Sequence, residues 1–428
     1  MRDKTPIKRP KTATIITLAS AGGALEMYDF VIYIFFAPTI ATLFFPLESS
    51  YAAMLSTLAI FASGYLFRPI GGIIFGHIGD RHGRRAGLLV TISIMGFAML
   101  AMALMPTYQM IGMTAPILFC FFRIMQGVAL GGDLPGAITF VNEYAGQRER
   151  GFLTGLLYCG VNVGLLMAAF VGMVFTNILS PHALENVGWR IAFLMGVSLF
   201  VVGFYFRAKN IETPLFTKMY EDRQRVKTPL FFLLKNYPLN LCRSIAMIAL
   251  HALIIVQVFL YMPIYLEKTV GMNAHYATIF NTFNIMIFSA LIPFFGELSD
   301  RFGRKIFFMI GTLGFLLLSY PLYHMINSPV QLHKLIGIFC FAPLSAMVVG
   351  IVPVTLAELF PTTVRYTAIG VTYNLGFGIF GGLSPILSTF LIHYFHHSSA
   401  LSINLIVTSF VLLLLIFSAQ FSKNQPLK

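Results

Sequence analysis

The feature that most constrains this chain is a series of twelve apolar stretches, each long enough to cross a lipid bilayer. A membrane-spanning helix needs about 20 apolar residues, and only a helix satisfies its backbone hydrogen bonds within one lipid-exposed segment. The sequence lacks the alternating strand pattern of a membrane β-barrel. We therefore predict twelve membrane-spanning helices, over 13–44, 52–78, 86–105, 112–141, 152–178, 188–207, 240–266, 276–298, 305–325, 334–358, 366–393 and 400–420.

The composition excludes a water-soluble fold. The 428 residues are 57% hydrophobic and 11% charged, whereas a soluble domain carries about 25% charged residues. This excludes soluble enzymes, secreted disulfide scaffolds and disordered chains. The four cysteines lie inside apolar runs and lack metal-ligand spacing, so we predict buried structural thiols.

The basic residues predict how the chain is oriented. The net charge is +13, and 24 of the 29 Lys and Arg residues fall on one side of the predicted spans. Only Arg190, Lys268 and Lys334 fall on the other side. Because cytoplasmic loops carry the excess of Lys and Arg, both termini and the central loop are predicted to be cytoplasmic. The positive charge is thus explained by topology and does not indicate a nucleic-acid surface.

An internal repeat divides the chain. The segment GHIGDRHGRR at 76–85 matches GELSDRFGRK at 296–305 with an offset of 220 residues. A Glu and an Arg seven residues apart follow in each half, Glu143 with Arg150 and Glu358 with Arg365. We predict two six-helix halves, 1–208 and 240–428, joined by a cytoplasmic loop at 209–239. Two such halves with a binding site at their interface are a transporter architecture.

Further motifs carry a family resemblance. They are EMYDF at 26–30, RPIGG at 68–72, RIMQG at 123–127 with GGD at 131–133, ETPLF at 212–216, and ELFP at 358–361. With the doubled loop, they make the sequence resemble the major facilitator superfamily. Within it, the chain is similar to the metabolite:proton symporter family of proline/betaine, α-ketoglutarate, citrate and shikimate carriers. Met27 stands where that family usually has Trp, and Asp133 where it usually has Glu.

Five charged residues lie inside predicted spans, where charge is costly and is a functional candidate by default. They are Glu26, Asp29, Arg68, Arg123 and Asp133. We expect an acid among Glu26, Asp29 and Asp133 to carry the coupling proton. We expect Arg68 or Arg123 to bind a negative group of the substrate, because a guanidinium donates two parallel hydrogen bonds to a carboxylate. The sequence does not choose within either set. The alternative is static ion pairs, in which loss of one partner destabilises the fold by about 3–5 kcal/mol.

Two further sets complete the candidate site. Polar residues inside spans are expected to line the substrate path, although hydrogen bonding between helices would also explain them. They are Tyr33, Tyr158, Asn162, Gln257, Tyr261, Asn281, Asn284, Tyr373 and Asn374. The family resemblance implies that the doubled loops and Glu–Arg pairs form a cytoplasmic gate; the alternative is topology signals with tight glycine turns. That set is Asp80, Arg81, Arg84, Glu143, Arg150, Asp300, Arg301, Arg304, Glu358 and Arg365.

The sequence therefore predicts an all-α integral membrane protein of the major facilitator fold, which is a secondary active transporter and not an enzyme. We expect proton-coupled symport of a small organic acid or zwitterion by alternating access, in a bacterial inner membrane. The proton gradient drives it, with no cofactor, metal or nucleic acid, and we expect a functional monomer. Two alternatives stay open: an exporter of a drug-like or siderophore-like compound, and a non-transporting receptor or scaffold.

Overall fold

The computed structural model of the chain describes residues 12–46, 49–82, 84–132, 134–146, 148–209 and 229–417. Within these ranges every regular element is a helix. The first half contains α1 (Thr12–Phe35), α2 (Ala37–Phe44), α3 (Ser50–Leu66), α4 (Arg68–His82), α5 (Arg84–Leu104), α6 (Tyr108–Ile111), α7 (Thr114–Leu130), α8 (Leu134–Tyr144), α9 (Arg150–Ile178), α10 (Pro181–Ala183), the π-helix η1 (Leu184–Gly188) and α11 (Trp189–Lys209).

The second half begins after residues that lie outside the described ranges. It contains α13 (Pro229–Asn236), α14 (Pro238–Leu253), the π-helix η2 (Ile254–Leu260), α15 (Met262–Lys268), α16 (Ala274–Phe302), α17 (Arg304–Ile326), α18 (Gln331–Phe339), α19 (Phe341–Val349), α20 (Val352–Leu359), α21 (Thr362–Gly376), the π-helix η3 (Phe377–Gly381), α22 (Gly382–Phe395), the 3₁₀ turn η4 (Ser398–Leu401) and α23 (Ser402–Phe417).

These helices account for the predicted spans. Ten helices of the described residues are long and apolar enough to cross a membrane. The first span is the pair α1 and α2, which bends by 60°. The third is the shorter apolar helix at 89–104 within α5. Each of the twelve predicted stretches therefore contains one of these units. Some spans run through more than one of these helices, as Ser50–Phe75 does through α3 and part of α4 and Val364–Phe395 through α21, η3 and α22.

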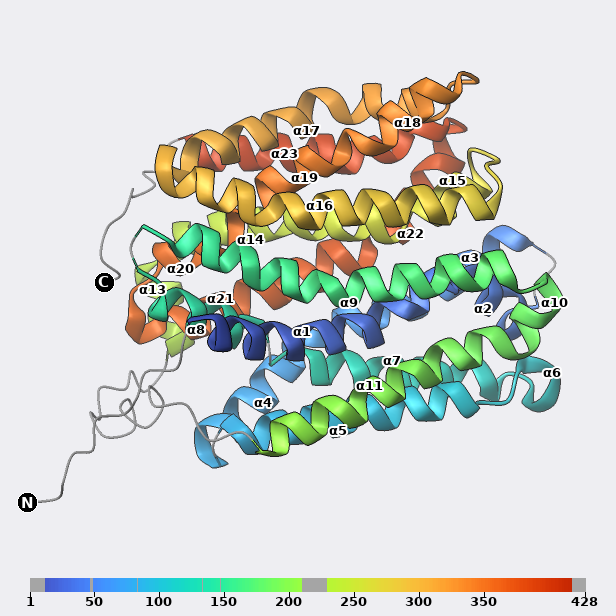
Figure 1. Cartoon of the computed structure of the whole chain (residues 1–428), viewed down its shortest axis with the longest axis horizontal. Coiled ribbons are helices and arrows are strands. Elements are labelled where there is room, and N and C mark those ends of the chain that lie inside the picture. The colour runs from blue at the N-terminus through green and yellow to red at the C-terminus, as the bar shows by residue number, and fades with distance from the viewer. Residues whose placement is uncertain are drawn as a thin grey trace, which may run out of the picture.

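The two halves lie side by side in Figure 1, with most helices of the first half below and most of the second half above, while α21 of the second half lies beside α8. Helix α9 of the first half and α16 of the second run together along the boundary and contact each other. The helices α3 and α22, and α21 with α4 and α8, also contact across it. The core between the halves is therefore built from both halves of the chain.

Glycines allow the closest helix contacts. A Cβ at Gly127 would lie 1.8 Å from the carbonyl oxygen of Gly64, and one at Gly131 would lie 2.2 Å from that of Arg68. Such backbone approach is typical of helix interfaces in membranes. Gly131 therefore serves helix packing.

The described end of the predicted central loop forms α13 and the start of α14, because a proline opens each helix, where its missing N–H is tolerated. The division of the chain at 208 and 240 stays a prediction.

The prediction of buried cysteines is wrong for Cys242 and Cys340, which are exposed, while Cys120 and Cys159 are half-buried. In a bilayer an apolar run can face lipid as readily as the protein core.

Candidate functional site

A small cavity lies between the two halves and is lined by two of the predicted charged residues. Its volume is about 20 Å³, little more than a water molecule needs. Helices α1, α3, α4, α7, α8 and α9 wall it on one side, and α21 and η3 on the other. It is lined by Gly23, Glu26, Met27, Phe30, Tyr65, Arg68, Leu130, Leu134, Val161, Tyr373 and Phe377.

Arg68 is the cation of this cavity. It opens α4 and is 4% exposed. Its guanidinium carbon lies 5.5 Å from the ring centre of Tyr65, 5.6 Å from that of Tyr373 and 5.5 Å from that of Phe377. Its Nε has no hydrogen-bond partner among the described residues. The guanidinium is thus held by aromatic faces and retains an unused donor.

The two acids of α1 occupy different surroundings. Glu26 lines the cavity with Arg68 and is 5% exposed. Asp29 is as deeply buried, but a Cβ at Gly196 of α11 would lie 2.6 Å from its Oδ1. Asp29 therefore lies against α11, and its Oδ1 has no hydrogen-bond partner in the described part of the chain. Residues three apart fall on one face in a helical sequence pattern, yet of these two acids only Glu26 lines the cavity.

Arg123 is held inside the first half. It is fully buried, and its Nη1 donates to the carbonyl of Phe30 at 3.1 Å and to Gln126 Oε1 at 2.9 Å. Its guanidinium lies 4.3 Å from the ring centre of Phe30 and 4.6 Å from that of Tyr33. The Nε and Nη2 atoms of Arg123 have no hydrogen-bond partner among the described residues. Unlike Arg68, Arg123 is absent from the cavity lining.

Three predicted lining residues make bonds within their own half. Tyr33 donates to the carbonyl of Thr57 at 2.9 Å. Gln257 Nε2 donates to the carbonyl of Leu401 at 2.8 Å, and its Oε1 accepts from Asn404 at 3.2 Å. The hydroxyl of Tyr261 bonds that of Thr389 at 2.7 Å. These bonds match the helix-to-helix alternative.

The predicted asparagines fall on the boundary between the halves or close to it. Asn374 donates from α21 to the carbonyl of Gly131 in the first half at 2.7 Å. Asn281 donates to the carbonyl of Phe259 at 3.0 Å. Asn284 on α16 is fully buried, and neither of its amide atoms has a partner among the described residues. The amide nitrogen of Asn162 on α9 is likewise unpartnered there.

Two aromatic residues that the sequence did not single out, Tyr65 and Phe377, wall the cavity. His251, a polar residue of the seventh predicted span, packs beside it. The ring centre of His251 lies 5.4 Å from that of Phe377 and 5.6 Å from that of Tyr158, a residue that was predicted. His251 is 1% exposed and its Nδ1 has no partner in the described residues. With 43 Phe and 18 Tyr in the chain, no local signal distinguishes these rings.

The repeat motif of the second half closes one end of the boundary. Both carboxylate oxygens of Asp300 accept hydrogen bonds from the start of α9, from the amides of Gly151 at 3.0 Å and Phe152 at 2.9 Å. Anions are stabilised at a helix N-terminus by its unpaired N–H groups and dipole. Arg304 completes the arrangement, with Nη1 2.6 Å from Asp300 and Nη2 3.1 Å from Glu358.

The Glu–Arg pairs also join the halves at this end. Arg365 Nη1 lies 3.0 Å from Glu143 Oε1, and Arg150 Nη1 lies 4.0 Å from Glu358 Oε1. Arg301 instead pairs with Glu297 of its own helix and is exposed. Asp80 and Arg81 fall in α4 and Arg84 opens α5, but their side chains, and the whole of Asp133, lie outside what the structure describes.

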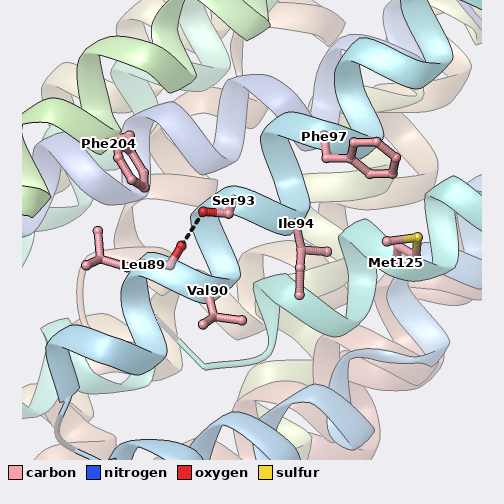
Figure 2. Close-up of a pocket in the computed structure, with 7 residues that line it drawn as sticks. All are labelled: Leu89, Val90, Ser93, Ile94, Phe97, Met125 and Phe204. Atoms are coloured by element: carbon pink, nitrogen blue, oxygen red, sulfur yellow. Dashed lines mark hydrogen bonds between the residues drawn. The ribbon is translucent and has the colours of Figure 1, made fainter.

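A larger groove lies elsewhere and has different chemistry. It measures about 420 Å³ and is lined from α5, α7 and α11 (Figure 2). Phe97 is 59% exposed and Val90 is 43% exposed. The only hydroxyl drawn, on Ser93, is bonded to the carbonyl of Leu89 at 2.7 Å (Figure 2). An apolar, open groove without charge suits lipid contact and does not suit a polar substrate.

Comparison with known proteins bears on the whole chain. The Major Facilitator Superfamily profile matches residues 19–290 and 266–427. The chain belongs to the major facilitator superfamily. It is 32% identical over 444 residues to the proline/betaine transporter of Escherichia coli K12, covering 100% of this chain and 87% of that protein. It is also 32% identical over 387 residues to a putative proline/betaine transporter of Staphylococcus aureus MSSA476, covering 90% and 83%.

Solved structures show the same fold. The proton:xylose symporter XylE bound to 6-bromo-6-deoxy-D-glucose superposes with a TM-score of 0.79 at 18% identity, over 97% of each chain. XylE from E. coli in a partially occluded inward-open conformation gives 0.76 at 18% identity, over 98% of this chain and 100% of the other. The protein is therefore a multi-pass membrane transporter of two six-helix halves, and the expectation that it is not an enzyme is confirmed.

Proposed function

We propose that this transporter is a proton-coupled symporter of a small zwitterion that carries a carboxylate, in the class of proline or glycine betaine. The observation that supports it best is that Arg68 and Glu26 line the same small cavity between the halves. An arginine with an unused donor offers a site for a carboxylate. The relatives named for proline and betaine favour the same class of substrate.

Arg68 rather than Arg123 binds the carboxylate in this proposal. Arg68 lines the cavity, whereas Arg123 is bonded to Phe30 and Gln126 inside the first half. The two predict different phenotypes for a lysine substitution, which keeps the charge and loses the planar fork. Arg68→Lys should lower substrate affinity and leave the amount of folded protein nearly unchanged. Arg123→Lys should lower the thermal stability of the protein.

Glu26 carries the proton in this proposal, because it shares the cavity with the substrate and Asp29 does not. A substrate carboxylate that bonds to Arg68 changes the field at Glu26 and so changes its affinity for a proton. Protonation and substrate binding are thereby linked in the same cavity. By this reasoning Asp29, against α11, has a supporting role.

The test is uptake of labelled proline and glycine betaine into proteoliposomes, with and without an imposed pH gradient. Glu26→Gln keeps the volume and removes the titration. We expect it to abolish accumulation driven by the pH gradient and to leave exchange of labelled for unlabelled substrate, since exchange moves no net proton. Asp29→Asn is the matched control and should keep the accumulation.

Accumulation by Glu26→Gln under a pH gradient alone would show that Glu26 is not the coupling group. If only Asp29→Asn loses accumulation, Asp29 is the coupling group. Failure of the unmodified protein to bind or transport either compound would refute the proposed substrate class.

We further propose that the end closed by Asp300 and the Glu–Arg pairs faces the cytoplasm, in a bacterial inner membrane, and that a monomer is the functional unit. The excess of Lys and Arg at this end supports the orientation. The proton gradient supplies the energy, and the proposed cycle uses no cofactor. Breaking these contacts would open the cavity to the cytoplasm.

A further inference from the structure

The surroundings of Arg68 have a composition that is unusual for an arginine. Three ring centres lie 5.5 to 5.6 Å from its guanidinium carbon, those of Tyr65, Tyr373 and Phe377. We call these three rings the aromatic cage. Among the ion pairs formed by described residues, none includes Arg68. The faces of three aromatic rings therefore contribute to stabilising this cation.

The cage is assembled from both halves of the transporter. Tyr65 comes from α3 of the first half, and Tyr373 and Phe377 come from α21 and η3 of the second. The rings of Tyr65 and Phe377 are nearly parallel, at 14° with centres 6.3 Å apart. A Cβ at Gly382 would lie 2.7 Å from Tyr65 Cβ. The cage is thus closed by a glycine-dependent contact across the boundary between the halves.

Rings in this arrangement suit a substituted ammonium group. The ring quadrupole attracts a cation that has little hydration to lose, and quaternary ammonium ligands are the typical case. Arginine gains more from a carboxylate, with which it forms two parallel charge-assisted hydrogen bonds. A zwitterion supplies both groups, a carboxylate for Arg68 and an ammonium for the rings.

We propose that Tyr65, Tyr373 and Phe377 form the subsite for the substrate's quaternary or secondary ammonium group. The Arg68 guanidinium occupies this subsite as an internal cation in the present structure. On binding, Arg68 turns to the substrate carboxylate and the ammonium takes its place among the rings. This inference rests on the proposed transport of a zwitterion and adds which residues recognise its positive end.

The test compares two ligands of the same shape that differ in one charge. Glycine betaine carries a trimethylammonium group, and 3,3-dimethylbutanoate carries a tert-butyl group in its place. Both keep the carboxylate. The dissociation constants of the two are measured on the purified full-length transporter by competition with labelled glycine betaine or proline. Their ratio reports recognition of the positive charge and does not depend on the fraction of protein that is folded.

The main variant is Phe377→Leu, which removes an aromatic face and leaves an apolar side chain. We expect it to lower the preference for glycine betaine over 3,3-dimethylbutanoate by about 2- to 30-fold. Phe377→Tyr keeps the face and should keep the preference. Phe390→Leu on α22 is the matched control, because Phe390 is 47% exposed and lies outside the cage. Tyr65→Leu removes another wall and gives the same test if Phe377→Leu does not fold.

An unchanged preference in Phe377→Leu and Tyr65→Leu would overturn the cage, as would an equal loss of affinity for both ligands. If the unmodified transporter binds neither glycine betaine nor proline, the proposed zwitterion substrate fails together with the cage. If it binds them and the cage variants keep the preference, the cage alone fails.

Discussion

The closed end depends on two glycines that face each other across the halves. A Cβ at Gly151 of α9 would lie 2.3 Å from the carbonyl oxygen of Gly296 on α16, and a Cβ at Gly296 would lie 2.3 Å from that of Gly151. Arg304 Nη1 and Asp300 Oδ1 are also close, at 2.5 and 3.0 Å from the Gly151 position. A methyl group at either glycine therefore meets backbone in the closed arrangement.

Gly151→Ala should shift the conformational equilibrium towards opening of this end. Ordinary contact begins at 3.4 Å, so the helices must separate by roughly 1 Å, and overpacking of this kind costs about 1–3 kcal/mol. Because that cost falls on the closed state alone, the ratio of open to closed should rise about 5- to 150-fold. Gly296→Ala should act in the same direction, since the contact is reciprocal.

The assay is a distance distribution between spin labels at positions 148 and 301, which are exposed on opposite halves at this end. The four native cysteines are replaced first. We expect Gly151→Ala to enlarge the long-distance population. Gly370→Ala is the control, because a Cβ there would meet nothing within 4 Å. If Gly151→Ala and Gly370→Ala give the same distribution as the parent, the glycine contact does not determine closure and the reasoning is refuted.

Three further outcomes are expected. Asp300→Asn removes the charge shared by the start of α9 and Arg304, so the same labels should show more of the open end, and an unchanged distribution would contradict the gate. Asn284→Leu replaces a buried amide that has no partner among the described residues. We expect this variant to keep the melting temperature of the parent and to transport less substrate. Unchanged uptake would place Asn284 outside the substrate path. A cysteine at Ser398 should react with an impermeant thiol reagent from outside intact cells and one at Arg148 should not; the reverse would overturn the orientation.

The helices were predictable because the requirements of the membrane apply to each segment separately. A lipid-exposed segment must satisfy its backbone within itself, so length and apolarity suffice to locate a span. The bend between α1 and α2 was not predictable from these terms, because one apolar run covers both helices. The gate was suggested by the repeat, but its partner, the start of α9, depends on how the halves dock.

The separation of Glu26 from Asp29 shows where periodicity fails. Residues three apart on a helix differ by about 60° around its axis, which counts as one face in a sequence pattern. In the packed transporter that angle is enough to place Glu26 at the cavity and Asp29 against α11. The same limit applies to Tyr65 and Phe377, whose roles follow from their position around Arg68 and not from residue type.

Helix α21 connects the cavity with the closed end. Tyr373 walls the cavity, and the next residue, Asn374, is bonded across the boundary to Gly131, which packs on the backbone of Arg68. Arg365 lies eight residues before Tyr373, about 12 Å along the helix, and pairs with Glu143 of the first half. If α21 moves as one unit, opening the closed end is expected to draw Tyr373 away from Arg68. We therefore expect occupancy of the cavity and opening of this end to be coupled through α21, which makes both sets of contacts.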